Sequence, residues 1–120
     1  MIAGFIEQTK PLSPYESETL LPVIVQGLHS KVGKDKAITN QQICLALKKL
    51  GYKLDNARLR KIINHIRINS MVIGLVATSD GYYVAESKKE LEVYLSSLKG
   101  REAAIRVVRQ SLEQQITMYE

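Results

Sequence analysis

In the first third of the chain, apolar positions recur at intervals of three and four, the period of an amphipathic helix. Ser13-Pro14-Tyr15-Glu16 has the chemistry of a helix start, with a capping serine, a proline in the first helical position and a glutamate at the third. We expect this helix to run to about Val32. Pro22 conflicts with one straight helix, so either the helix kinks there or it begins near Thr19.

Two further helices follow with a short connection. Ala37-Ile38 supplies at most a short strand, and Thr39 with Gln42 forms a capping box for a helix whose buried stripe is Ile43, Leu47 and Leu50, helped by Cys44 and Ala46. Gly51 is placed to stop this helix in the left-handed conformation. Asp55 then caps a helix that runs to about Asn69 and buries Leu59, Ile62, Ile63 and Ile66.

A β-hairpin is predicted next, because Val72–Thr78 and Tyr82–Ala85 are rich in strand-forming residues. Ser79-Asp80-Gly81 lies between them, and Asp-Gly suits the positive φ of a tight turn. Since side chains alternate along a strand, one of Tyr82 and Tyr83 should face the core and the other should face outward.

From Ser87, with Glu90 three residues on, a helical pattern continues to about Met118. Gly100 alone interrupts it and marks a bend or a break into two helices. Such a helix is too long to bury its whole apolar stripe on a small domain, so we expect its distal half to meet another chain as a homodimer. The alternative is that the helix folds back on its own domain. The expected oligomerisation residues are Ile105, Val108, Leu112 and Ile116.

The third helix carries the candidate chemistry. At 100° per residue, Lys61 and Asn64 lie opposite its core face, and Arg60 and Arg67 flank it. Arg and Asn side chains form paired hydrogen bonds with guanine and adenine edges, and the free N–H groups at a helix start favour an anion. The expected DNA-binding residues are Thr39, Asn40, Gln41, Asn56, Arg58, Arg60, Lys61, Asn64 and Arg67. For each of them a plain capping or surface role is the alternative, and Asp80 at the hairpin tip counts mildly against a phosphate grip.

The charge distribution supports a polyanionic partner. The chain has a net charge of +5, and the segment from Lys31 to Arg67 holds ten Lys or Arg against Asp35 and Asp55, which is +8. The basic charge is therefore concentrated in the segment that holds the candidate chemistry.

Other functions find little support. The chain shows no phosphate loop, nucleophile elbow or paired carboxylates, so we expect no enzyme activity and no cofactor. His29, His65 and Cys44 lack metal-ligand spacing, so no metal is expected, and Cys44 reads as a buried apolar residue. With no stretch long enough to span a bilayer and no secretory signal, a cytoplasmic location is expected.

Helix, turn, basic helix and hairpin over Thr39–Ala85 resemble a winged helix-turn-helix domain. Gly81-Tyr82-Tyr83-Val84-Ala85 and Ser87-Lys88-Lys89-Glu90-Leu91 are similar to the hairpin exit of small phage- or prophage-type winged-helix proteins. This resemblance covers about residues 19–112. It implies a role in transcriptional control or in phage or plasmid replication, and it does not choose between them.

The expected architecture is mainly α with a small hairpin wing, an α+β fold. It comprises a loose arm over residues 1–12, a winged-helix domain over 13–86 and a C-terminal helix over 87–120. The expected function is binding of double-stranded DNA, by sequence or by structure. The alternative is a non-enzymatic protein-interaction module built on the same scaffold and the long helix.

Overall fold

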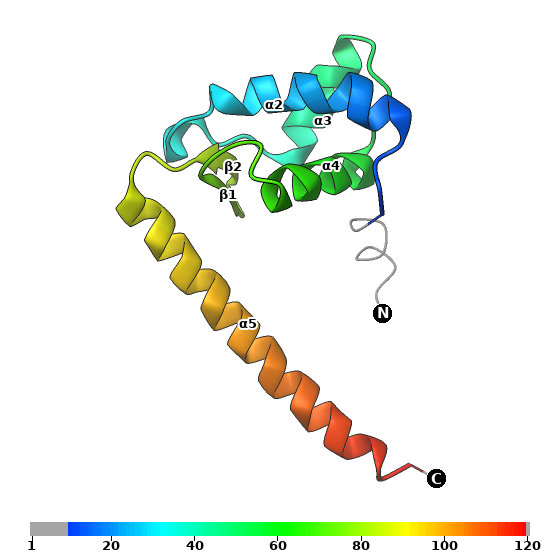
Figure 1. Cartoon of the computed structure of the whole chain (residues 1–120), viewed down its shortest axis with the longest axis vertical. Coiled ribbons are helices and arrows are strands. Elements are labelled where there is room, and N and C mark those ends of the chain that lie inside the picture. The colour runs from blue at the N-terminus through cyan, green and yellow to red at the C-terminus, as the bar shows by residue number, and fades with distance from the viewer. Residues whose placement is uncertain (1–9, 120) are drawn as a thin grey trace. The chain divides into compact units, whose positions relative to one another are not determined.

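The computed structural model describes residues 10–119. Within them the chain forms a mainly helical unit with one antiparallel hairpin, followed by a long C-terminal helix, which confirms the expected α+β class (Figure 1). These two compact units divide at Ser87. The arm expected over residues 1–12 lies mostly outside the described residues, and its last residue, Leu12, packs against the core.

The first helical segment begins where its cap predicts. The Ser13 N–H donates to Glu16 Oε1 at 2.8 Å and the Glu16 N–H donates to Ser13 Oγ at 3.3 Å, which is a complete capping box. Helical turns run without a gap through η1 (Glu16–Leu20), a π-helical turn, and α2 (Leu21–His29). The helix therefore does not start near Thr19, and its turn directly before Pro22 is widened to a π-helical turn, which accommodates the proline ring and its missing N–H.

The helix ends at His29, three residues before the predicted Val32. The reason is a competing backbone pairing: Val84 N–H donates to Lys31 O at 2.7 Å and Gly33 N–H donates to Val84 O at 2.9 Å. A short 3-10 turn, η2 (Lys34–Lys36), follows.

The helices α3 (Asn40–Lys49) and α4 (Asn56–Ile68) have the predicted caps. Thr39 and Gln42 form a complete capping box, and Asp55 accepts the Arg58 N–H at 2.8 Å. The predicted burial of Leu50 was wrong, because this residue is the C-cap of α3 and is 73% exposed. Ala46 is exposed as well, and Leu54 of the connector is buried in the core.

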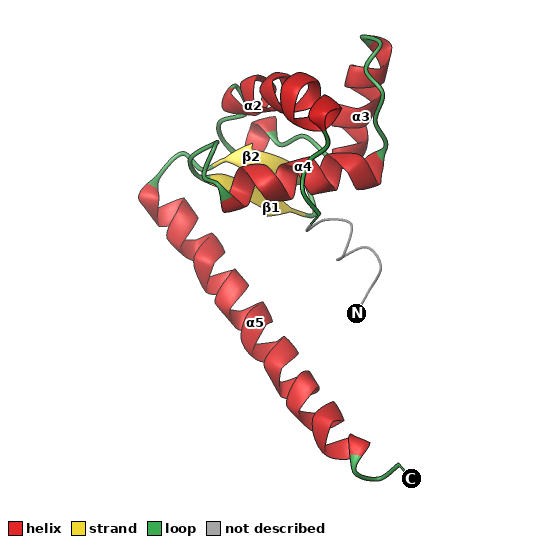
Figure 2. Cartoon of the chain, turned by 45° about the vertical axis from the view of Figure 1, so that its right-hand side comes forward, coloured by secondary structure: helices red, strands yellow, loops and turns green. Residues whose placement is uncertain are grey.

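The hairpin consists of β1 (Leu75–Thr78) and β2 (Gly81–Val84), drawn in yellow in Figure 2. Thr78 pairs with Gly81, so the loop is Ser79-Asp80, and Gly81 opens β2 with φ +121° instead of forming the turn as predicted. Ile38 adds a one-residue antiparallel bridge to Tyr82, which confirms the short strand. Tyr83 is buried and Tyr82 is partly exposed, as the alternation predicts.

The core of this unit is aliphatic. Leu20, Leu59, Ile62, Ile66 and Val76 are its most enclosed large side chains. Cys44 is 4% exposed within the same core, and burial raises the pKa of its thiol, as a structural role predicts.

The C-terminal unit is one unbroken helix, α5 (Lys88–Ile116), capped by Ser87, which accepts the Glu90 N–H at 3.2 Å (Figure 2). Gly100 lies inside it, so the predicted break does not occur. None of the described side chains of α5 is buried. The expected oligomerisation residues are all well exposed: Ile105, Val108, Leu112 and Ile116.

Candidate nucleic-acid interface

The two flanks of α4 have different surroundings. On one flank, Glu16 from the start of the first helix lies between two cations of α4. Arg58 Nε lies 2.9 Å from Glu16 Oε2, and Lys61 Nζ lies 2.7 Å from Glu16 Oε1. Glu16 itself is only 4% exposed. This ion-pair cluster of Glu16, Arg58 and Lys61 fastens the N-terminal helix to α4.

The predicted placement of Lys61 on the open face of α4 was wrong. Its side chain is 13% exposed and is directed to Glu16, a buried residue of η1 that packs over this flank. Arg58 is also held by contacts within the protein. Its guanidinium donates to Lys53 O at 3.0 Å and lies 5.4 Å from the Tyr15 ring centroid.

The pKa of Glu16 reports the strength of this cluster. Burial acts to raise the pKa, but the hydrogen bonds from Lys61, from the Ser13 N–H and from Arg58 outweigh it and lower the pKa from 4.5 to about 2. The carboxylate is therefore ionised at neutral pH and partnered by both cations.

The opposite flank of α4 carries Asn56, Arg60, Asn64 and Arg67, at successive spacings of four, four and three residues. This spacing places the four side chains along one line of the helix, which we call the polar flank. Arg60 and Asn56 are exposed, and Asn64 and Arg67 are partly exposed. The polar flank joins two arginines with two amides, the side chains that read base edges and bind phosphate.

Asn40 ties the polar flank to the hairpin. Its Nδ2 donates to Asn56 O at 3.2 Å and to Asn56 Oδ1 at 3.1 Å, and its Oδ1 accepts the Tyr82 hydroxyl at 3.0 Å. Burial raises the pKa of Tyr82, while the nearby charges of Arg60 and Arg67 oppose that rise. The start of α3, the polar flank and β2 therefore form one continuous region.

The other predicted residues at the start of α3 have separate positions. Thr39 Oγ1 accepts the Gln42 N–H at 3.1 Å, so this side chain is used as a helix cap. Gln41 is exposed on the first turn of α3. Of the nine predicted residues, the structure thus gathers five beside the hairpin, Asn40, Asn56, Arg60, Asn64 and Arg67.

Two residues of this region were not predicted: Glu16 and Tyr82. Glu16 was read only as the end of a capping box, and its partners lie 42 and 45 positions further along the chain. No local pattern signals such a pairing. A partly buried tyrosine hydroxyl usually forms a hydrogen bond, which was the one available hint for Tyr82.

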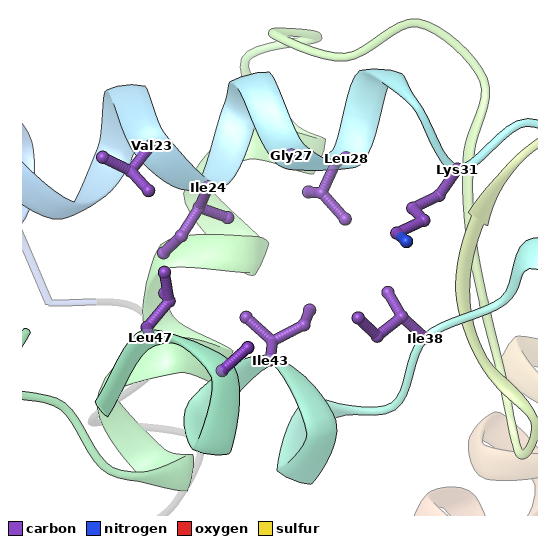
Figure 3. Close-up of a pocket in the computed structure, with 9 residues that line it drawn as sticks. Val23, Ile24, Gly27, Leu28, Lys31, Ile38, Ile43 and Leu47 are labelled. Carbon is purple, nitrogen blue, oxygen red and sulfur yellow. The ribbon is translucent and has the colours of Figure 1, made fainter. Parts of the chain in front are cut away.

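A separate apolar groove of about 130 Å³ lies between α2 and α3 (Figure 3). Among its nine lining residues Lys31 alone is charged, and its side chain extends along the groove wall near Ile38 (Figure 3). Such a lining suits an apolar side chain or small apolar ligand, and it offers no reactive group besides the amine.

Among residues 10–119 no three His, Cys, Asp or Glu side chains gather as a metal site. No helix in this described part is long and apolar enough to cross a membrane. No family model matches the chain, and comparisons with curated proteins and with solved structures found no match. The function is therefore inferred from the geometry.

Proposed function

We propose that this protein binds double-stranded DNA through the polar flank of α4, with the β1–β2 hairpin beside it as a wing. The observation that carries the proposal is the line of Asn56, Arg60, Asn64 and Arg67, joined through Asn40 to the hairpin. Two consecutive helices, α3 and α4, followed by a hairpin have the element order of a winged helix-turn-helix.

The chemistry of the flank divides into two roles. Arg60 is exposed at mid-helix and offers a guanidinium fork to a guanine edge, while Asn64, one turn further, offers an amide to adenine. Arg67 near the helix end and Gln41 on α3 are assigned to the phosphate backbone. Residues 10–86 hold eleven Lys or Arg against six Asp or Glu, a net charge of +5 that favours DNA approach.

A salt titration tests the proposal. Affinity for duplex DNA should fall steeply with salt concentration, since each neutralised phosphate releases counterions with a slope of about 0.9 per contact. Arg60→Ala/Arg67→Ala should weaken binding at least tenfold and reduce the slope by about one to two units. Lys99→Ala, an exposed cation on α5, is the control and should leave both unchanged.

Absence of duplex binding at low salt would refute the proposal. If Arg60→Ala/Arg67→Ala bound as tightly as the unaltered protein, the polar flank would not be the interface. Asn64→Ala should reduce discrimination between a selected sequence and random duplex more than it reduces affinity for random duplex. Equal losses would assign the protein to structure-specific binding.

The resemblance to small winged-helix proteins supports a role as a transcriptional regulator or as an accessory protein in phage or plasmid replication. Binding that requires one operator sequence favours the first role, and binding to junctions or melted duplex favours the second.

The second candidate function is a protein-interaction module. The exposed apolar stripe of α5 and the apolar groove between α2 and α3 favour it. A stoichiometric complex with a protein that persists without DNA, together with no duplex binding, would support this function over the first.

A further inference from the structure

The apolar side of α5 repeats every seven residues. Leu98, Ile105 and Leu112 occupy one helix line, which corresponds to the a position of a coiled coil. The neighbouring d line holds Arg101, Val108 and Gln115. The e line holds Leu95, Glu102, Arg109 and Ile116. Ile105, Val108, Leu112 and Ile116 are 54–69% exposed. The side chains form a self-complementary pattern only in one orientation.

We infer that α5 pairs with α5 of a second copy in antiparallel orientation, centred between Arg106 and Val107. In this alignment an a residue of one helix faces a d residue of the partner. Ile105 then packs on Val108 twice by symmetry, and the aliphatic stem of Arg101 covers Leu112. This inference does not depend on DNA binding.

Charge complementarity selects the antiparallel orientation. In antiparallel helices the e lines face each other, so Glu102 of each helix lies opposite Arg109 of the other, and Leu95 lies opposite Ile116. Two ion pairs and two apolar pairs result from the same register.

A parallel pair lacks these contacts. In a parallel pair, Arg101 would lie against Arg101 of the partner helix at the d layer. Glu102 and Arg109 would lie opposite uncharged g residues of the partner helix, which are Ser97 and Ala104. Like charges at a seam oppose pairing. The sequence of α5 thus favours one orientation through attraction and disfavours the other through repulsion.

The charges are available for pairing. Within one helix, Arg106 lies 3.7 Å from Glu102, and Arg109 is paired with Glu113. All four side chains are more than half exposed, so these internal pairs contribute little stability and exchange readily for a partner across the seam.

A charge exchange tests the seam. Glu102→Arg places arginine opposite Arg109 twice and should weaken dimerisation about tenfold or more in sedimentation equilibrium, while Glu102→Arg/Arg109→Glu should restore it. Arg106→Glu is the matched control, because it removes the same internal pair outside the seam and should change the dissociation constant less than about threefold.

A distance measurement tests the orientation. In a Cys44→Ala background, a spin label on Lys88→Cys reports the separation of the two N-terminal ends of α5. The antiparallel register places these ends about 55 Å apart at 1.5 Å per residue, and a parallel pair places them about 10 Å apart. The short distance would overturn the inference, and so would a chain that stays monomeric up to near-millimolar concentration.

Discussion

Replacing Glu16 by glutamine tests how much the ion-pair cluster stabilises the fold. Glutamine keeps an oxygen that can accept the Ser13 N–H, and it is a normal capping-box residue, so this change removes the charge and leaves the cap. Arg58 and Lys61 then lose their common anion. We expect a clear loss of stability that depends on pH.

The magnitude follows from the pKa. Folding lowers the pKa of Glu16 from 4.5 to about 2, and each pKa unit corresponds to about 1.4 kcal/mol, so the ionised carboxylate contributes about 3 kcal/mol at pH 7. A domain of this size has roughly 5–15 kcal/mol in total. The contribution is therefore a substantial share of the unfolding free energy.

The sign of the pH dependence is fixed by the direction of the shift. Because the folded-state pKa lies below the unfolded-state value, the stabilisation is complete above about pH 5 and is lost as the pH falls toward 2. The difference in unfolding free energy between the unaltered protein and Glu16→Gln should thus be about 3 kcal/mol at pH 7 and roughly 1.5 kcal/mol at pH 3.

Urea denaturation at a series of pH values measures this difference without adding salt. Glu18→Gln, two residues away and exposed, is the control and should change stability by less than about 0.5 kcal/mol at any pH. A penalty for Glu16→Gln that is the same at pH 7 and pH 3 would refute the electrostatic explanation and would assign the effect to packing.

Two further substitutions test the hairpin contacts. Gly81→Ala should destabilise the protein by more than about 2 kcal/mol in urea denaturation. Gly81 has φ +121°, and the added Cβ would lie 2.5 Å from Ile38 O. Gly100→Ala is the control and should not destabilise the protein, because its added Cβ would lie in open space on α5. Tyr82→Phe should lower the free energy of unfolding by about 0.5–1.5 kcal/mol, because it removes the hydrogen bond from the Tyr82 hydroxyl to Asn40. Tyr119→Phe, which alters an exposed side chain, is its control. An unchanged urea midpoint for Tyr82→Phe would show that this hydrogen bond adds no stability.

Local chemistry predicted the helix starts well. The caps at Ser13, Thr39, Asp55 and Ser87 were all found, because each depends on a side chain and a backbone N–H three residues apart. Helix ends were less predictable. The first helix ends at His29, because the backbone of Lys31 pairs with Val84, a residue more than fifty positions away.

The candidate site shows the same limit. A helical wheel assigned the buried face of α4 correctly, but it could not show that one flank is covered by another part of the chain. Lys61 was expected to be open for that reason, and it is ion-paired with Glu16 at a separation of 45 positions. The periodicity of apolar residues describes one helix at a time. Whether one flank of that helix is covered depends on where a helix distant in the sequence begins.

This division of α4 leads to a last test that separates a narrow DNA interface from a wide one. Glu16→Gln releases Arg58 and Lys61 on the flank opposite Arg60 and Arg67. If DNA contacts only the polar flank, the released cations add a distant positive charge, so the affinity for duplex should rise by less than about threefold and the salt slope should stay constant.

If DNA covers both flanks, as the sequence alone predicted, each released cation that reaches a phosphate steepens the slope by about 0.9, to a total of nearly two units. The measurement is a salt titration of Glu16→Gln against the unaltered protein at pH 7, under conditions where circular dichroism shows both to be folded. A steeper slope would place Arg58 and Lys61 in the interface, and the ion-pair cluster would then compete with DNA for the same cations. A constant slope would limit these two side chains to holding the first helix on α4.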